Sequence, residues 1–274
     1  MKRVLSAVVI IAVMILVIAF SHVPFVLNIF VALISAAALY EAMVVTKYIE
    51  SKFLIVISMG FALCIPFVHM LPELLHSAVT FSIFVYTVIV FATLLIFSKV
   101  FSFERLSVIF LLSLMIPLFF TTLVYSRGLP YGLYNLILIF IVSWLTDTGG
   151  YIFGRLFGRH KMAPRISTKK TVEGAIGGIL ASVGVCICFA YIVDIFDASV
   201  EVNYLRLGIY AAIGAVFAIF GDLSASLIKR NFGVKDFGHL IPGHGGVMDR
   251  FDSVMFVAPF LYLALEALPV FFRV

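Results

Sequence analysis

The chain has 274 residues, of which 64% are hydrophobic and 12% charged, with a formal net charge of +5 at pH 7. Soluble domains are typically about half apolar and a quarter charged, so this composition and a mean hydropathy of +1.20 exclude an ordinary soluble domain. Runs of about 20 apolar residues predict membrane-spanning helices, and they lack the alternation of membrane β-strands. We therefore expect an all-α, polytopic integral membrane protein with about nine transmembrane helices.

The apolar runs follow one another along the whole chain. The first two are separated only by residues 21–24, which predict a tight hairpin. We expect the first run to be a span rather than a cleaved signal, because no small-residue cleavage site follows it. Prolines inside three of the runs predict kinked helices. The expected spans are approximately 4–20, 24–45, 53–70, 79–98, 106–125, 132–153, 174–194, 205–228 and 253–272.

The positive charges lie mainly in every second loop. Sixteen of the 19 Lys and Arg residues fall at the N-terminus and in the loops after the second, fourth, sixth and eighth runs. Cytoplasmic loops carry such an excess, so we expect the N-terminus in the cytoplasm and the C-terminus outside. The two large basic loops, 154–173 and 229–252, then share the cytoplasmic face and are expected to form one pocket.

We expect one continuous membrane domain with two parts. Residues 1–130 would form an N-terminal set of lipid-facing or oligomerisation helices. Residues 131–274 would form the catalytic helices, because they contain both large basic loops and the chain's densest run of charge.

The first group of candidate site residues begins with Asp147, near the end of the sixth run. An aspartate within a span costs roughly 2.5–3.5 kcal/mol, so its carboxylate should be paired, metal-bound or facing water; a carboxylate that has simply reached the interface is the alternative. The basic run that follows, with Lys169 and Lys170, suits nucleotide phosphates. Anchoring of the loop to anionic lipid headgroups is its alternative.

The second group lies on the eighth run, where Asp222 is embedded in apolar sequence. Ser226 follows one helical turn later and shares its face. A serine inside a membrane helix is more often a packing residue than a catalyst. Lys229 and Arg230 then mark the exit of the helix into the cytoplasm.

The third group is the glycine-rich loop before the last run. Residues 242–246, P-G-H-G-G, predict a turn whose amides could approach phosphate oxygens. Asp249 and Asp252 are three residues apart and would share one face of the ninth helix, which suits a hard cation such as magnesium. An ion pair of Asp249 with Arg250 is the alternative, and His244 could be a base, a metal ligand or a hydrogen-bond donor.

These motifs resemble a known family. The segment Ser226–Asp252 reads S-L-I-K-R, four residues, K-D-F-G, two residues, I-P-G-H-G-G-V-M-D-R-F-D, and is similar to the signature of phosphatidate cytidylyltransferases (CDP-diacylglycerol synthases). The upstream D-T-G-G-Y-x-x-G-R and K-M-x-P-x-I-S-T-K-K-T-x-E-G also resemble that family, which commonly has proline where this chain has Thr168. The motifs cover about one third of the chain, and the N-terminal half resembles the family only in hydropathy and length.

The resemblance implies that the protein is a magnesium-dependent nucleotidyltransferase. It would convert CTP and phosphatidic acid into CDP-diacylglycerol and pyrophosphate for phospholipid biosynthesis, at the cytoplasmic side of the cell inner membrane. Membrane lipids would be its surroundings, no nucleic acid would bind, and a second cation and a homodimer are left open. The implied metal ligands are Asp147, Asp222 and Asp249; the implied catalytic residues are Asp222, Asp249, Lys229, Arg230, His244 and Arg250; and the implied substrate-binding residues are Lys169, Lys170, Ser226, Lys235, Gly245 and Gly246.

Two other functions remain open at this point. A CTP-dependent polyprenol or phytol kinase would use related architecture but release CDP. An ion-coupled transporter would use intramembrane carboxylates as ion ligands, although charge on one face only is against it. The remaining acids, including Glu41, Asp194, Asp197 and Glu266, are expected to have structural roles.

Overall fold

The computed structural model describes residues 2–45, 51–70, 77–97, 102–241, 243 and 245–273. Within these ranges the chain is mainly α-helical, which confirms the predicted fold class. The helices are α1 (Lys2–Ala19), α2 (Val26–Tyr40), α3 (Lys52–Cys64), α4 (Ala78–Ile96), α5 (Phe103–Gly128), α6 (Gly132–Phe157), α7 (Val172–Phe196), α8 (Tyr204–Asn231) and α9 (Met248–Ala267). A π-helix (Glu41–Val45) extends α2, and a 3-10 helix (Ile65–Met70) extends α3.

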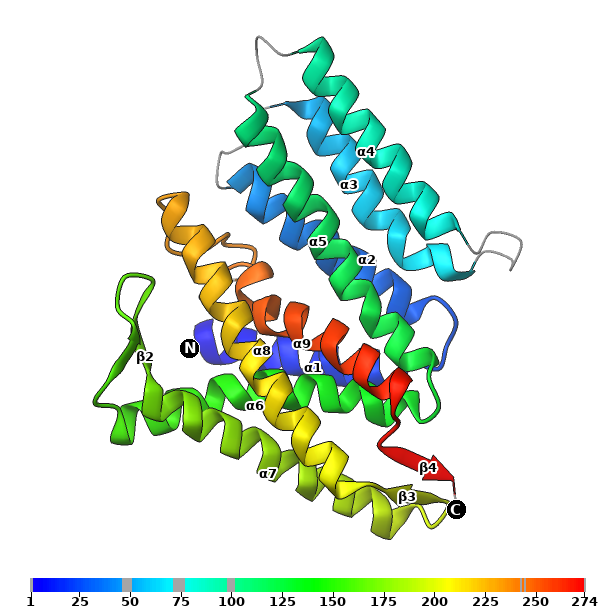
Figure 1. Ribbon diagram of the computed structural model, residues 1–274, viewed down its shortest axis with the longest axis vertical. Helices are drawn as coiled ribbons and strands as arrows, with labels where there is room; N and C mark the ends of the chain where they lie inside the picture. The colour runs from blue at the N-terminus through cyan, green and yellow to red at the C-terminus, as the bar shows by residue number, and fades with distance from the viewer. Residues whose placement is uncertain are drawn as a thin grey trace. The chain divides into compact units, whose positions relative to one another are not determined.

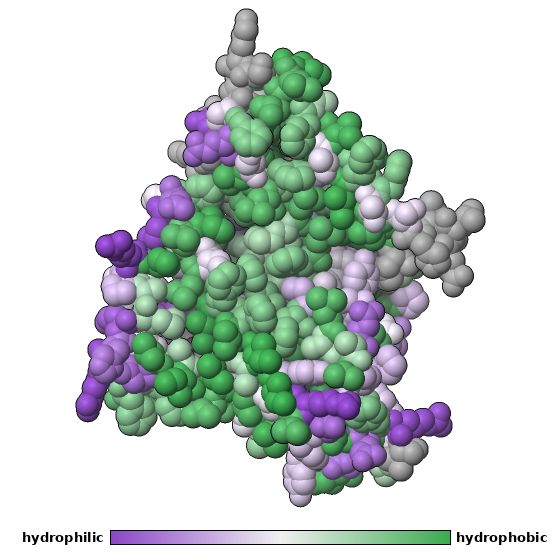
Figure 2. Space-filling view, in the orientation of Figure 1, coloured by the Kyte–Doolittle hydropathy of each residue, from purple (hydrophilic) through white to green (hydrophobic). Residues whose placement is uncertain are grey.

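Each predicted span corresponds to one of these helices. Within the described ranges, six segments are long and apolar enough to cross a membrane by length and composition: Val26–Val44, Ala78–Ile96, Phe103–Gly128, Gly132–Phe157, Val172–Phe196 and Tyr204–Asn231. Figure 2 shows that much of the visible surface is hydrophobic. Large apolar side chains are exposed along these helices, for example Leu95 at 79%, as expected where lipid replaces water. The protein is therefore a polytopic membrane protein.

The chain forms two compact units. The first consists of Met1–Val124 with Asp236–Arg250, and the second of Tyr125–Lys235 with Phe251–Val274. The glycine-rich loop before α9 thus groups with the N-terminal helices, whereas most of α9 groups with α6, α7 and α8. This grouping follows packing in space, so it does not test the predicted division of function near residue 130.

In the first unit, α2 packs against α3 and a buried polar chain links three helices. The Tyr86 hydroxyl on α4 is 2.8 Å from the Ser58 hydroxyl on α3 and also hydrogen-bonds the Ser113 hydroxyl on α5. Asn28 on α2 donates to the carbonyl of Pro66, at 2.6 Å, where α3 has changed into the 3-10 helix. A proline removes a backbone donor and disrupts the helix. The Asn28 side chain therefore supplies a hydrogen bond to a carbonyl oxygen where the helix is irregular.

In the second unit, α6 and α7 run side by side and are joined at one end by the hairpin of β1 (Lys161–Ala163) and β2 (Ser167–Thr171) (Figure 1). Small residues line their interface. A Cβ added to Gly149 would lie 2.7 Å from Ala181 Cβ, and one added to Gly178 would lie 2.5 Å from the Thr146 carbonyl oxygen. Close backbone approach at small residues is the usual way in which membrane helices pack.

The opposite end of the second unit is closed by a second strand pair, β3 (Val200–Val202) with β4 (Phe271–Arg273). Hydrogen bonds from the Ser199 hydroxyl and from Tyr134 hold the pKa of the half-buried Asp197 carboxyl below its ordinary value. Neither strand pair was predicted, because three to five residues in a polar connection carry too little hydrophobic pattern to indicate a strand.

Candidate active site

The second unit contains a cavity of about 260 Å³ that combines carboxylates with lysines. Its walls come from α6, the β1–β2 hairpin, the first turn of α7 and α8. It therefore opens where the basic loop after α6 meets the membrane helices. The lining residues are Thr146, Asp147, Gly150, Tyr151, Met162, Ser167, Lys169, Lys170, Thr171, Gly174, Ala175, Ile219 and Asp222.

An ion pair crosses this cavity from the hairpin to α8. The ammonium group of Lys170, at the end of β2, contacts the carboxylate of Asp222. Both side chains are largely buried, with 22% and 26% of their surface exposed. Removing one partner of such a pair leaves an uncompensated charge in a poorly hydrated site. Each side chain therefore holds the charged group of the other in place. Sequence predicted both residues, and the structure brings them together.

Two further acids lie beside this ion pair, Asp147 on α6 and Asp252 near the start of α9. The Ser253 hydroxyl donates to Asp147 on α6 at 2.7 Å, and its backbone N–H donates to Asp252 at 2.8 Å. Asp252 is only 6% exposed and interacts electrostatically with Asp222, Asp147 and Lys229. Three carboxylates and two lysines thus form one charge cluster on four elements of the second unit.

Glycine on α8 allows this cluster to assemble. A Cβ added to Gly221 would lie 2.7 Å from the carbonyl oxygen of Asp252 and 2.9 Å from the ring of Phe256. The residue before Asp222 must therefore lack a side chain for α8 to pack against α9. This close approach is what places Asp222 and Asp252 within the same cluster.

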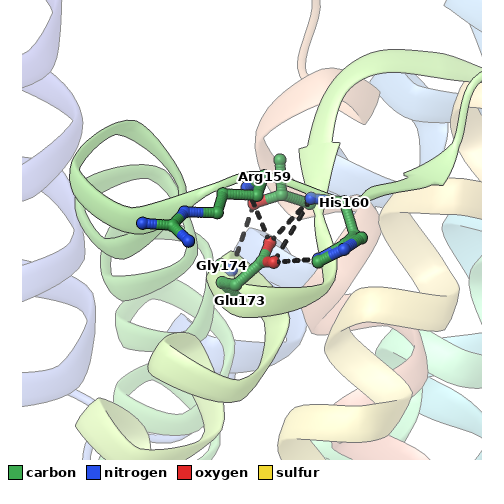
Figure 3. Close-up of polar contacts among 5 residues, drawn as sticks. Arg159, His160, Glu173 and Gly174 are labelled. Carbon is green, nitrogen blue, oxygen red and sulfur yellow. Dashed lines mark hydrogen bonds and ion pairs between the residues drawn. The ribbon is translucent and has the colours of Figure 1, made fainter.

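A carboxylate holds the base of the hairpin that carries the lysines (Figure 3). Glu173, in the first turn of α7, accepts hydrogen bonds from the backbone N–H groups of Arg159 and His160, at 3.0 and 3.2 Å. The His160 ring lies 2.6 Å from the same carboxylate. Thr171 caps α7 by accepting from the Gly174 N–H at 3.1 Å. These contacts fix both ends of the loop from which Lys170 projects.

The predicted serine and basic residues at the end of α8 have distinct surroundings. Ser226 shares the face of Asp222, as predicted, and its hydroxyl is 3.4 Å from that carboxylate. Lys229 is 9% exposed and belongs to the charge cluster. Arg230 reaches back to the hairpin, where its Nε is 3.5 Å from the carbonyl of Ile166. Lys235 is exposed.

The glycine-rich loop belongs to the first unit, where Asp249 organises its backbone. One oxygen of Asp249 accepts from the N–H groups of Phe237 and Gly246, at 2.9 and 3.0 Å. Gly245 has a φ of +86°, which favours glycine. Asp249 lies in the first turn of α9, as predicted. Its assignment as a metal ligand stays a prediction.

The other predicted residues of this loop are less defined. Arg250 is exposed, and its backbone N–H bonds the Val247 carbonyl. His244 lies outside the described residues, so its role stays a prediction. The shared pocket predicted for the two basic loops also stays a prediction.

Three polar residues acquire partners that sequence did not identify: Asp252, Ser253 and Glu41. Asp252 was visible as the second acid of D-R-F-D, but its association with Asp147 depends on how α9 packs on α6. No feature of the sequence identified Ser253 as a site residue. Glu41 accepts a hydrogen bond from the backbone N–H of Met248, 207 residues away, at 2.9 Å, and only the tertiary structure could indicate that contact.

The oxygens of the charge cluster match the ligands of a hard cation. Within the described ranges, no group of three or more His, Cys, Asp or Glu side chains forms a ready-made metal cage. Magnesium usually keeps several waters and needs only one or two carboxylates together with substrate phosphates. The carboxylate oxygens of Asp147, Asp222 and Asp252 are of the kind that magnesium prefers, and the assignment of Asp147 and Asp222 as metal ligands stays a prediction.

The fold and the site together define a membrane-embedded protein with a phosphate-compatible pocket at the ends of its helices. The model of the cytidylyltransferase family matches residues 1–268. The chain therefore belongs to the cytidylyltransferase family.

Individual relatives match a shorter segment. The phosphatidate cytidylyltransferase of Staphylococcus haemolyticus (strain JCSC1435) is 50% identical over 140 residues, which are 51% of this chain and 50% of that protein. The protein of the same name from Staphylococcus aureus (strain COL) is 49% identical over 140 residues, again 51% and 50% of the two chains. The matched segment thus spans about half the length of these relatives.

Proposed function

We propose that this protein transfers the cytidylyl group of CTP to phosphatidic acid, giving CDP-diacylglycerol and pyrophosphate. The observation that carries the proposal is the cavity lined by Lys169, Lys170, Asp147 and Asp222, in which Lys170 pairs with Asp222. Such a mixture of cations and carboxylates suits a nucleoside triphosphate with its metal. Membership of the cytidylyltransferase family and the name of the relatives, phosphatidate cytidylyltransferase, support the choice of nucleotide and lipid.

In this reaction the substrate supplies the nucleophile. A phosphate oxygen of phosphatidic acid attacks the α-phosphorus of CTP, and the bond from that phosphorus to the oxygen bridging to the β-phosphate breaks. The new bond is the diphosphate linkage of CDP-diacylglycerol, and pyrophosphate leaves with the bridging oxygen. The protein therefore has no covalent step to perform and acts by positioning the two phosphates and by stabilising charge.

The positions of the basic residues suggest which phosphates each of them would bind. Lys170 and Lys229 belong to the charge cluster and would hold the reacting phosphates. Lys169 lines the same cavity and, with Arg230 beside the hairpin, would bind the outer phosphates that leave as pyrophosphate. A lysine with a rotatable stem can follow the charge as it moves to the leaving group.

The carboxylates would hold magnesium, directly or through water. Magnesium, when bound, neutralises the triphosphate and makes the α-phosphorus more electrophilic. Asp147, Asp222 and Asp252 are the ligands that the charge cluster favours, and Asp249 remains the ligand that the sequence motif favours. Asp249→Asn should nearly abolish turnover while the protein still inserts and folds, because an amide is a poor magnesium ligand. Wild-type turnover of this variant at saturating magnesium would remove Asp249 from the site.

The site is proposed to face the cytoplasm of a bacterial cell membrane. The supporting observation is the charge asymmetry of the loops, which by the positive-inside rule favours a cytoplasmic position for the β1–β2 hairpin. CTP would then enter from water, and phosphatidic acid from the inner leaflet.

The leaving group tests the function most simply. Purified protein is incubated with phosphatidic acid, magnesium and CTP labelled on either the α- or the γ-phosphorus. Cytidylyl transfer moves the α-label into the lipid and releases the γ-label as pyrophosphate. A lipid kinase would move the γ-label into the lipid and release CDP, and this result would refute the proposal.

A further inference from the structure

Glu41 is a carboxylate buried inside the first unit, and the reaction described above does not use it. It begins the π-helix at the end of α2, and its side chain is 0% exposed. Ionisable residues within a membrane span are costly, rare and usually functional. Single π-turns are likewise rare and are frequent at functional sites. Both features indicate that Glu41 has a functional role.

Its contacts are with the glycine-rich loop. One oxygen, Oε2, accepts from the backbone N–H of Met248, the first residue of α9, at 2.9 Å. The other oxygen, Oε1, is buried and has no hydrogen-bond partner among the residues that the structure describes. A helix leaves its first N–H groups without partners inside the helix, so Glu41 supplies, from another helix, the cap that α9 needs.

Two glycines of the loop leave the space that Glu41 fills. A Cβ added to Gly238 would lie 2.5 Å from Oε1 of Glu41, and one added to Gly246 would lie 2.3 Å from Oε2. Real Cβ atoms do not approach oxygen so closely. The backbone of the loop therefore folds directly around the carboxylate, which explains a glycine at each position by packing alone.

Glu41 and Asp249 hold the same loop from two directions. Asp249 accepts from the N–H groups of Gly246 and Phe237, and Glu41 packs against the α-carbon of Gly246 while it caps Met248. The first-turn residues of α9, including Asp249, thus have their backbone set by an acid from α2.

We propose that Glu41 is a positioning residue. It fixes the backbone of residues 236–241 and 245–247 and the first turn of α9, and so orients Asp249 for the reaction. This inference rests on the proposed function for its catalytic part, and on contacts within the first unit for its structural part. Glu41 would touch neither CTP nor the lipid.

The test compares Glu41→Ala, Glu41→Gln and the control Ser35→Ala in the full-length protein in detergent. Ser35 lies on the same helix, is 0% exposed and has a hydroxyl without a hydrogen-bond partner among the described residues. It therefore tests the loss of a buried polar group on α2 that does not cap α9. Glutamine keeps a carbonyl oxygen for the Met248 N–H and should preserve most of the effect of Glu41.

The first readout is hydrogen–deuterium exchange, which does not depend on any activity. Loss of a hydrogen bond to a charged group should speed exchange of amides within 236–250 at least about tenfold in Glu41→Ala. Peptides from α6 and α7 should exchange as in the wild type, Ser35→Ala should match the wild type throughout, and Glu41→Gln should lie close to it. Unchanged exchange of the loop in Glu41→Ala would overturn the inference, as would equal acceleration over the whole chain in both Glu41 variants.

The second readout separates positioning from a general loss of structure. In the labelled-CTP assay, Glu41→Ala should lower kcat by about tenfold or more while KM for CTP stays within about twofold, and Glu41→Gln should recover most of kcat. A mobile loop with unchanged kcat would overturn the catalytic part. If the wild type transfers no cytidylyl group, the proposed function fails, whereas the exchange data still decide whether Glu41 orders the loop.

Discussion

The close packing of α6 on α7 gives a quantitative prediction for Gly178→Ala. The added Cβ would lie 2.5 Å from the carbonyl oxygen of Thr146, whereas ordinary contact begins at 3.4 Å. The two helices must therefore separate locally by about 0.9 Å, since a backbone oxygen cannot rotate away. Overpacking of this kind costs about 1–3 kcal/mol. Gly184→Ala on the same helix is the matched control, because its Cβ would meet nothing within 4 Å.

Both variants gain the same helix propensity, about 1 kcal/mol for Gly to Ala. Their difference in stability therefore isolates the clash, which should lower the Tm of Gly178→Ala by roughly 2–10 °C relative to Gly184→Ala. The assay is thermal unfolding in detergent followed by the emission of Trp144, the chain's single tryptophan, which lies on α6. Turnover should also fall in Gly178→Ala, because Thr146 immediately precedes Asp147. Equal Tm values for the two variants would refute the packing argument.

Four further predictions follow from other parts of the molecule. Lys170→Ala should clearly raise KM or lower kcat/KM for one anionic substrate while it has a smaller effect on stability, measured as Tm. An unchanged kcat/KM would show that this lysine does not bind substrate. Glu173→Gln should weaken the contacts at the base of the hairpin and speed its hydrogen exchange severalfold; protection equal to the wild type would contradict that role. Because the pKa of Asp197 is lowered in the folded protein, its ionised carboxylate stabilises the fold at pH values above the ordinary pKa of 3.8. This stabilisation is lost as the pH falls through the lowered pKa, so Asp197→Asn should flatten the acid limb of a Tm-against-pH curve. Cysteine introduced at Ser77, but not at Lys161, should react with a membrane-impermeant reagent in intact cells after the native cysteines are removed; the reverse pattern would invert the topology.

The helices could be predicted from sequence because their signal is local. A run of about 20 apolar residues in a bilayer satisfies its own backbone hydrogen bonds as an α-helix. Each expected span corresponds to a helix. Their exact ends could not be predicted. The span expected over 24–45 changes into a π-helix at Glu41, and that over 53–70 changes into a 3-10 helix at Ile65.

The candidate site was predicted residue by residue but not as an arrangement. Asp147, Asp222 and Lys170 were identified because charge inside or beside an apolar run is costly and needs a reason. The pairing of Lys170 with Asp222 and the link through Ser253 depend on how distant segments pack. Glu41 shows the limit most clearly, since its acceptor role is defined by an N–H group 207 residues away.

The central claim is that the charge cluster of the second unit carries out cytidylyl transfer, and Asp252 tests it most directly. The measurement is the initial rate of α-label transfer from CTP to phosphatidic acid by Asp252→Asn, with Asp194→Asn, an exposed acid near the far end of α7, as the control. Removing one hydrogen-bond donor from a preorganised electrostatic site typically costs about 10²–10³ in kcat. We expect the loss of a cluster carboxylate to cost at least as much, so Asp252→Asn should lose about 100-fold or more in kcat while its Tm stays within a few degrees of wild type. The control should keep wild-type turnover. Wild-type turnover by Asp252→Asn would contradict the account.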